Sequence, residues 1–417
     1  MLPGPLTETS RIELFPLSIL PEDGEFIVGR KRTGTFAALP PIGLRAIELL
    51  RAGLPLGQVQ VSLMDGPGEE TDLEAFVLEL VELGFVKAID GHPLLAARVE
   101  PSHLPRLQPG HIAWLFRWPA VSLIGLLVLA ASLALLRDPS LAPRFEYFFW
   151  SRSTSLALAG NAAWILLNQA LHELAHLMAA RSLGVPARIG LGTRLHNLVA
   201  LTDVSGLWAV PRRQRYRVYL AGIAWDLIPL SLAVLLLAHA RLPILTQQML
   251  KAILLANWLG IVWQFQLYLR TDLYYVLVEL LRARNVYEDA LQVLHHLARP
   301  WLRLSSGSAP AHPLAAYTAA EARKVQAFAI VLFVGSALSL GVFAAYGVPA
   351  LLALFSAAFG ALRSRISHQN LPLVADGAVT ILVVSGFLLL YLVTFLNSRG
   401  VGPAAILQRI RRRSTAP

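Results

Sequence analysis

The sequence predicts a mainly α-helical protein, a polytopic membrane bundle of about six spanning helices that follows a small α+β, winged-helix-like domain. Of the 417 residues, 55% are hydrophobic and only 15% are charged, and the mean hydropathy is +0.56. Soluble domains typically contain about 45–50% apolar residues, so this chain is too apolar for that class. Most of the apolar residues lie in long runs that follow a region of mixed polarity at the amino terminus.

The amino-terminal region, residues 1–100, is expected to form a cytosolic domain. Residues that favour β-structure predict short strands at Glu25–Val28, Thr35–Leu39 and Phe85–Ile89. Apolar residues at helical spacing predict one helix that begins at Pro41 and another over residues 73–83. Helices followed by a strand and a tight turn indicate a winged-helix-like unit.

A linker over residues 101–112 precedes the membrane region, residues 113–397, and a basic cytosolic tail over 398–417 ends the chain. Each apolar run of the membrane region is near or above the roughly 20 residues that cross a bilayer as a helix. A further run, Val348–Leu362, is apolar but short, which predicts an interfacial helix. The predicted spans lie near Ala113–Leu136, Ser155–Leu183, Tyr216–Ala238, Ile253–Leu281, Val325–Tyr346 and Pro372–Asn397.

Basic residues set the predicted orientation. With the amino terminus in the cytosol, the cytosolic loops are Gly184–Arg215, Arg282–Lys324 and the tail after Ser398. They hold more than twice as many Lys and Arg residues as the opposite loops, which fits the positive-inside rule with both termini cytosolic. Because the basic residues flank apolar runs, the net charge of +10 indicates membrane topology rather than nucleic-acid binding. The expected partner is the lipid bilayer.

One predicted span carries a possible metal site at His172, Glu173 and His176. Two histidines four residues apart on a helix lie on one face and can bind one ion, and a glutamate beside the first can take a proton from water. Ionisable residues inside a span are costly and usually functional. Because the chain has no cysteine, any metal must be held by His, Asp or Glu. The alternative is a pair of histidines that hydrogen-bond between helices.

The run His172–Arg181 resembles the active-site helix of site-2-protease-type intramembrane zinc metalloproteases, and more narrowly the bacterial peptide-maturation branch of that family. The resemblance implies a bound Zn²⁺, Glu173 as the catalytic base, a peptide or membrane-protein substrate and a multi-pass location in the bacterial inner membrane. It continues downstream through segments whose spacing matches that branch, which are Asp203–Arg213, Ala221-Gly222, Thr271–Leu277 and Ala319–Val325.

A zinc protease needs a third protein ligand, and the resemblance implies Asp272. The chain departs from the family pattern here, because Leu273 replaces a glycine and Gln264–Leu267 replaces an upstream segment with Asn and Pro. Asp226 lies at a similar depth in the third predicted span. Depth therefore leaves both carboxylates open as the third ligand, and only the resemblance favours Asp272.

The amino-terminal domain resembles the leader-peptide-binding family typified by the pyrroloquinoline-quinone biosynthesis protein D. The resemblance rests on Asp23–Arg30, Leu39–Pro41 and Leu80–Phe85, and it implies that a leader peptide binds as an added strand. A regulatory or packing domain is the alternative. The β-prone loop Leu195–Val210 could pair with an extended substrate or form a surface hairpin, and His196 is expected to be an interfacial side chain rather than a ligand.

The function expected from these observations is zinc-dependent hydrolysis of a peptide bond in a leader-bearing or membrane-associated peptide. One alternative is a non-catalytic membrane protein that assists peptide binding or export. A less favoured alternative is a membrane di-iron oxidase whose His boxes would be His172-x-x-x-His176 and Gln292-x-x-His295-His296.

Overall fold

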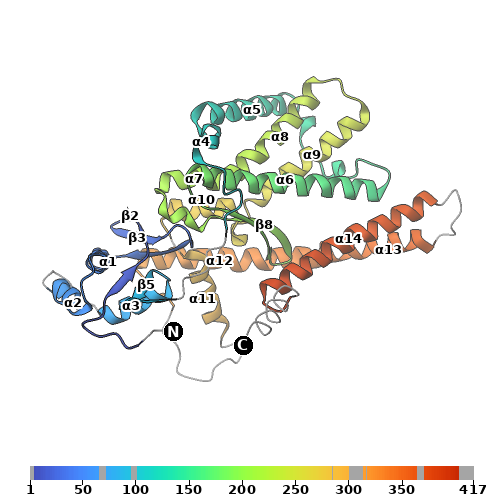
Figure 1. The fold of residues 1–417 in the computed structure, drawn as a ribbon. Coiled ribbons are helices and arrows are strands. Elements are labelled where there is room, and N and C mark those ends of the chain that lie inside the picture. The colour runs from blue at the N-terminus through green and yellow to red at the C-terminus, as the bar shows by residue number, and fades with distance from the viewer. Residues whose placement is uncertain are drawn as a thin grey trace. The chain divides into compact units, whose positions relative to one another are not determined.

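The computed structural model of the chain describes residues 4–64, 72–94, 101–283, 285–299, 313–315, 317–363 and 371–402 (Figure 1). These residues form two compact units. The N-terminal unit comprises Met1–Arg117, Leu177–Ile189 and Thr202–Val218, and the membrane unit comprises Trp118–His176, Gly190–Leu201 and Tyr219–Pro417. The predicted basic tail lies almost entirely outside the described residues.

The amino-terminal part of the N-terminal unit contains two small antiparallel sheets and three helices. One sheet has the strand order β2-β3-β4 and the other β1-β5-β6. The predicted strands correspond to β3, β4 and β5, and the two predicted helices to α1 and α3, so these predictions are confirmed. The elements are β1 (Ile12–Leu14), β2 (Ser18–Glu22), β3 (Glu25–Arg30), β4 (Thr35–Leu39), α1 (Pro41–Arg51), α2 (Leu56–Met64), α3 (Leu73–Glu82), β5 (Val86–Ile89) and β6 (His92–Pro93).

One hydrophobic core holds these strands and helices together. Ile47 of α1, Val59 of α2 and Val77 of α3 are fully buried, and each contributes to the same core as Val28 and Phe85. Ile47, Val77 and Val28 lie on the apolar face of a predicted helix or strand, which is why the sequence pattern predicted those elements, whereas α2, which contributes Val59, was not predicted. The helices are expected to owe most of their stability to this burial rather than to intrinsic helix propensity.

The N-terminal unit also includes short elements from the linker and from the loop before the third predicted span. These are α4 (Pro109–Ile112), η1 (Ala113–Phe116), η4 (Ser205–Ala209) and α7 (Arg212–Tyr219). The β2–β3 hairpin contacts η4, and Glu22 at its end forms an ion pair with Arg215 of α7. The turn between β3 and β4 also lies against η4, because a Cβ added at Gly34 would collide with Ser205.

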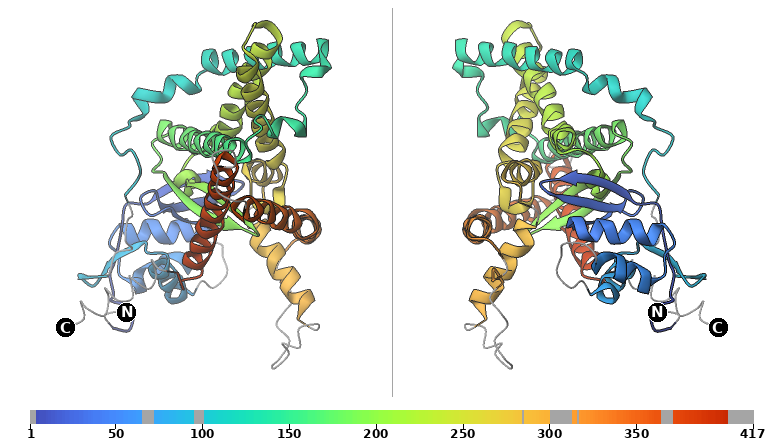
Figure 2. Two further views of the ribbon diagram at one scale, coloured as in Figure 1. Left: turned by 90° about the vertical axis from the view of Figure 1, so that its right-hand side faces the viewer. Right: turned by 90° about the vertical axis from the view of Figure 1, so that its left-hand side faces the viewer.

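The membrane unit is almost entirely helical, and in its spans α8 packs against both α5 and α9 (Figure 2). Helices α13 and α14 pair along their length at the orange and red end of the chain (Figure 1). The helices are α5 (Trp118–Arg137), η2 (Pro139–Leu141), η3 (Phe145–Phe148), α6 (Thr154–Ser182), α8 (Ala221–His239), α9 (Ile244–Trp263), η5 (Leu267–Leu269), α10 (Asp272–Leu281), α11 (Val286–Ala298), α12 (Ala319–Val342), η6 (Phe343–Gly347), α13 (Val348–Arg363) and α14 (Leu371–Ser398).

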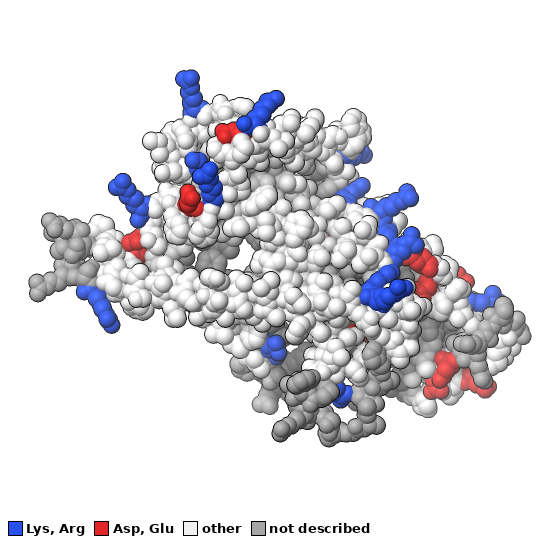
Figure 3. All heavy atoms as spheres, turned by 180° about the vertical axis from the view of Figure 1, so that it is seen from behind, with Lys and Arg blue, Asp and Glu red and all other residues white. Residues whose placement is uncertain are grey.

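Among the described residues, five helical segments are long and apolar enough to cross a membrane. They are Pro109–Arg137, Arg212–His239, Ile244–Trp263, Ala319–Arg363 and Leu371–Ser398. Broad areas of the face in Figure 3 carry no charged side chain, as expected for a protein embedded in lipid. The predicted number of six is therefore not reproduced. The predicted second span is α6, which forms a helix of 29 residues but is not among the five.

The predicted fourth span, Ile253–Leu281, is wrong as a single helix. Helix α9 ends at Trp263, and α10 begins at Asp272. The eight intervening residues form a turn that includes η5, and Arg270 adopts a left-handed conformation with φ of 55°. An α-helix cannot continue through such a residue, which explains the break. The predicted interfacial segment is α13, which continues from α12 through the π-helical turn η6.

A two-stranded sheet, β7 (Arg188–Arg194) and β8 (Asn197–Asp203), forms a hairpin between the second and third predicted spans. Of the β-prone segment Leu195–Val210, only β8 is a strand, and β7 precedes the segment. In the membrane unit, Leu195 at the hairpin tip has a positive φ of 51°. His196 stacks on Phe343 with ring centroids 4.3 Å apart. His196 therefore packs on an aromatic ring at the tip of the hairpin.

Candidate metal centre

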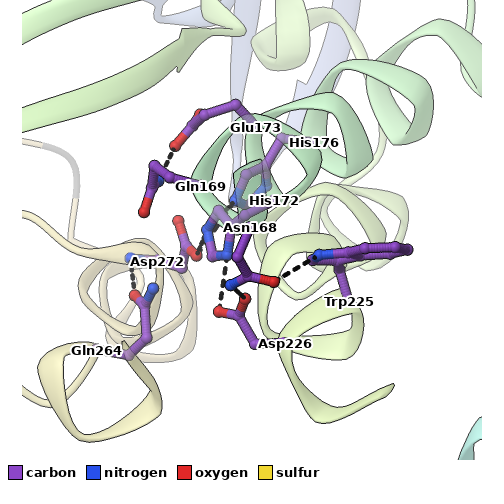
Figure 4. Close-up of polar contacts among 9 residues, drawn as sticks. All are labelled: Asn168, Gln169, His172, Glu173, His176, Trp225, Asp226, Gln264 and Asp272. Atoms are coloured by element: carbon purple, nitrogen blue, oxygen red, sulfur yellow. Dashed lines mark hydrogen bonds and ion pairs between the residues drawn. The ribbon is translucent and has the colours of Figure 1, made fainter. Parts of the chain in front are cut away.

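Three side chains of the membrane unit bring one ligand atom each to a common point. His172 Nε2 lies 3.1 Å from Asp272 Oδ2 and 3.1 Å from His176 Nε2. His176 Nε2 lies 3.2 Å from Asp272 Oδ2, which closes the triangle. Figure 4 shows the two imidazoles facing the carboxylate. These three residues could hold a metal ion.

The two histidines converge because α6 places them one turn apart. Residues at positions i and i+4 of a helix lie on one face, and the rings of His172 and His176 have centroids 4.8 Å apart. Both residues are buried, with 4% and 6% exposure. Asp272 comes from a different helix, where it is the first residue of α10 after the N-cap Thr271. The positive end of the helix dipole at this position stabilises a carboxylate.

The donor set and the spacing of the triangle fit a zinc ion. Zinc binds imidazole nitrogen and carboxylate oxygen at about 2.0–2.2 Å, and tetrahedral geometry then separates neighbouring ligand atoms by about 3.3–3.5 Å. The three observed separations of 3.1–3.2 Å are close to this spacing. Imidazole and carboxylate ligands also suit other divalent metals, so the geometry alone does not select zinc.

A glycine keeps the approach to the triangle open. A Cβ added at Gly222 of α8 would collide with Nε2 of both His172 and His176. Any residue other than glycine would therefore fill the space in front of the two ligand nitrogens. Gly222 belongs to the Ala221-Gly222 pair, one of the segments on which the resemblance to the metalloprotease family rests.

Asp226 contacts His172 on the opposite side of the ring from the triangle. Its Oδ2 lies 2.8 Å from His172 Nδ1, and its Oδ1 accepts a hydrogen bond of 2.8 Å from Asn168 Nδ2. Asn168 Oδ1 in turn accepts from Trp225 Nε1 at 3.1 Å. Asp226 is thus outside the three-residue group and bonded through both oxygens. A carboxylate on the far nitrogen of a histidine ligand fixes the ring and leaves Nε2 for the metal.

Glu173 is next to His172 in sequence and is buried, with 4% exposure. Gln169, one helical turn earlier, donates a hydrogen bond of 2.8 Å from Nε2 to Glu173 Oε1. Figure 4 shows the two side chains together beside the triangle. Burial and this contact restrict the carboxylate to a narrow set of orientations close to the candidate ligands.

The turn before α10 places Asp272. Gln264 Oε1 accepts a hydrogen bond of 3.0 Å from the backbone N–H of Asp272. Thr271 Oγ1 donates to the carbonyl of Gln264 at 2.6 Å. The glutamine that departs from the family pattern is therefore part of the structure that holds the candidate third ligand.

Asn168 and Gln169 are functional candidates that were not predicted from the sequence. Each is polar and lies four residues before a site residue on α6, so the same helical periodicity that paired the histidines could have identified them. Within the described part of the chain, His295 and His296 of α11 are not part of the metal-binding group.

Comparison with known protein families, curated proteins and solved structures finds no match to this chain. The arrangement of His172, His176, Asp272 and their neighbours therefore carries the functional argument.

Proposed function

We propose that the protein is an intramembrane zinc metalloendopeptidase that hydrolyses a peptide bond in a membrane-associated or leader-bearing peptide. The convergence of His172 Nε2, His176 Nε2 and Asp272 Oδ2, with Glu173 beside them on the same helix, carries this proposal. The apolar helices of the membrane unit support catalysis within a membrane, and in this proposal that membrane is the bacterial inner membrane.

His172, His176 and Asp272 would hold the ion, with Asp226 fixing the His172 ring through Nδ1. When bound, zinc supplies Lewis-acid activation of a water molecule and of the peptide carbonyl. Glu173 takes the proton from the attacking water at its carboxylate and delivers it to the amine that leaves. Gln169 orients Glu173 for both transfers through the hydrogen bond to Oε1.

Buried surroundings make this proton transfer more effective than it would be in water. Glu173 and both histidines are at most 6% exposed, so charges that develop during the reaction are poorly screened by solvent. The same burial limits access of competing water to the reacting groups. A peptide must present its backbone in an extended form to reach such a site, and the β7–β8 hairpin offers a strand edge for that purpose.

The N-terminal unit supports a leader-bearing peptide as substrate. Its β2-β3-β4 sheet leaves outer strand edges, and an extended leader segment can add to a strand edge of this kind. In this proposal, the leader is bound by the N-terminal unit while the cleavable segment enters the membrane unit.

A comparison of wild type with Glu173→Gln tests the proposed hydrolysis. Both forms are expressed in a bacterial host, and the peptides of the membrane fraction are compared by mass spectrometry for new termini. New termini are expected with wild type alone, because the amide cannot accept the proton, while both purified proteins contain zinc. Identical termini for the two forms would contradict hydrolysis and would favour a non-catalytic role in peptide binding or export.

A further inference from the structure

The tip of the β7–β8 hairpin is attached to the turn that precedes Asp272. The Arg194 guanidinium donates through Nη1 to the carbonyl oxygens of Leu269 and Arg270, and the second of these contacts measures 3.2 Å. Arg194 is thus 75 residues away in sequence from Leu269 but bonded to it. Both ends of this contact belong to the membrane unit.

The turn that Arg194 contacts has a conformation that its own sequence disfavours. Arg270 has a backbone φ of 55°, in the left-handed region that residues other than glycine rarely adopt. Such a residue persists only where surrounding contacts hold it. Its own side chain forms an ion pair of 3.1 Å with Glu288 and lies over the ring of Tyr287.

Besides the contacts of the Arg270 side chain, two kinds of contact hold the turn. The hydrogen bonds of Gln264 with Thr271 and Asp272 are internal to it. Arg194 is the contact from the hairpin, and it binds the two carbonyl groups that come just before Thr271, the N-cap of α10. A guanidinium is suited to this position because it is permanently charged and its Nη1 carries two N–H groups, one for each carbonyl oxygen.

We propose that Arg194 is a positioning residue for the third metal ligand. By holding the carbonyls of Leu269 and Arg270, its guanidinium keeps the turn in the left-handed conformation that directs the Asp272 carboxylate at the two imidazoles. This inference rests on the proposed metal site. It makes the hairpin part of the structure that sets metal affinity, although no hairpin residue is a ligand.

Metal affinity of the purified full-length protein in detergent tests the proposal. Zinc affinity is measured by competition with a chromogenic chelator for wild type, Arg194→Ala and Arg194→Lys. Loss of a residue that supports a ligand typically weakens metal binding by about 10–100-fold. The zinc affinity of Arg194→Ala is therefore expected to be lower than that of wild type by a factor in this range. Arg194→Lys is expected to recover part of the loss, since an ammonium group can still donate to one carbonyl.

Tyr391→Phe provides the matched control. The Tyr391 hydroxyl donates to the Leu195 carbonyl at 2.8 Å, so this variant loosens the same hairpin tip without touching the turn before Asp272. It is expected to keep wild-type zinc affinity. If Tyr391→Phe and Arg194→Ala lost equal zinc affinity, any contact that fixes the hairpin tip would have the same effect as the contact of Arg194 with the turn. That result would overturn the proposal.

Cobalt spectra add a readout of the ligand set itself. The visible absorption of Co²⁺ in Arg194→Ala is expected to shift toward that of Asp272→Ala. Wild-type affinity and an unchanged cobalt spectrum in Arg194→Ala would overturn the role of Arg194 and leave the metal site standing. Absence of zinc and cobalt binding in wild type would instead refute the metal site, and the role of Arg194 with it.

Discussion

Among the described residues, two clusters of buried polar side chains, one around Arg215 and one around His172, are satisfied in different ways. In the N-terminal unit, Arg215 is 0% exposed. Its Nη2 donates to Glu22 Oε2 at 2.6 Å, its Nε donates to the Val210 carbonyl at 2.9 Å, and its guanidinium lies over the Trp208 ring. Arg212 pairs with both Glu22 and Asp23, so the cluster contains two positive and two negative charges.

In the cluster of the membrane unit, Nε2 of His172 and Nε2 of His176 converge on Asp272 Oδ2. If His172 Nδ1 donates to Asp226, its Nε2 presents a lone pair toward Asp272 Oδ2, 3.1 Å away. Two acceptors at this distance repel unless a cation or a proton lies between them. A buried polar cluster that is closed indicates a structural role, whereas one with converging acceptors indicates a ligand site. The following variants test this distinction.

The largest effect is expected from Gly222→Ala. The new Cβ would collide with both ligand nitrogens, so zinc is expected to fall from about one ion per chain to near zero, measured by inductively coupled plasma mass spectrometry. Gly125→Ala in α5 is the control, because its Cβ would meet no atom within 4 Å. Full zinc occupancy in Gly222→Ala would show that the triangle is not where the metal binds.

The next effect concerns stability rather than metal. Glu22→Leu removes the carboxylate that neutralises Arg215, and breaking a buried ion pair from one side costs about 3–5 kcal/mol. Denaturant titration of tryptophan fluorescence should show this loss in the free energy of unfolding, while the zinc content of the folded protein stays unchanged.

The double variant Glu22→Leu, Arg215→Met sharpens the same test. Replacing both members of a buried pair by apolar residues is often close to neutral, so most of the lost stability is expected to return. If the zinc content of folded Glu22→Leu instead fell together with its free energy of unfolding, the two clusters would not be independent.

Local sequence patterns were sufficient for the elements that depend on local contacts. The strand β4 and the helix α1 of the N-terminal unit have their predicted starts at Thr35 and Pro41. The pairing of His172 with His176 followed from helical periodicity alone. In each case the feature depends on residues within one or two turns, which the sequence displays directly.

Features fixed by distant contacts could not be predicted in this way. The break between α9 and α10 depends on a left-handed Arg270 whose carbonyl is held by Arg194, and no local pattern marks that contact. Depth along the helices also could not separate Asp226 from Asp272. Only the folded arrangement shows that one carboxylate faces Nδ1 of His172 and the other faces Nε2.

The smallest expected effect separates the roles of these two carboxylates. Asp226→Asn keeps the shape of the side chain but removes its charge, so the His172 ring loses its fixed orientation and basicity without losing a ligand. The zinc affinity of Asp226→Asn is expected to fall by about 10–100-fold. The zinc affinity of Asp272→Ala should fall further, because this variant removes a ligand atom. Both affinities can be measured by chelator competition. The opposite order would make Asp226 the ligand and Asp272 its support, because the residue that contacts the ion directly must contribute more to binding than one that acts through an imidazole.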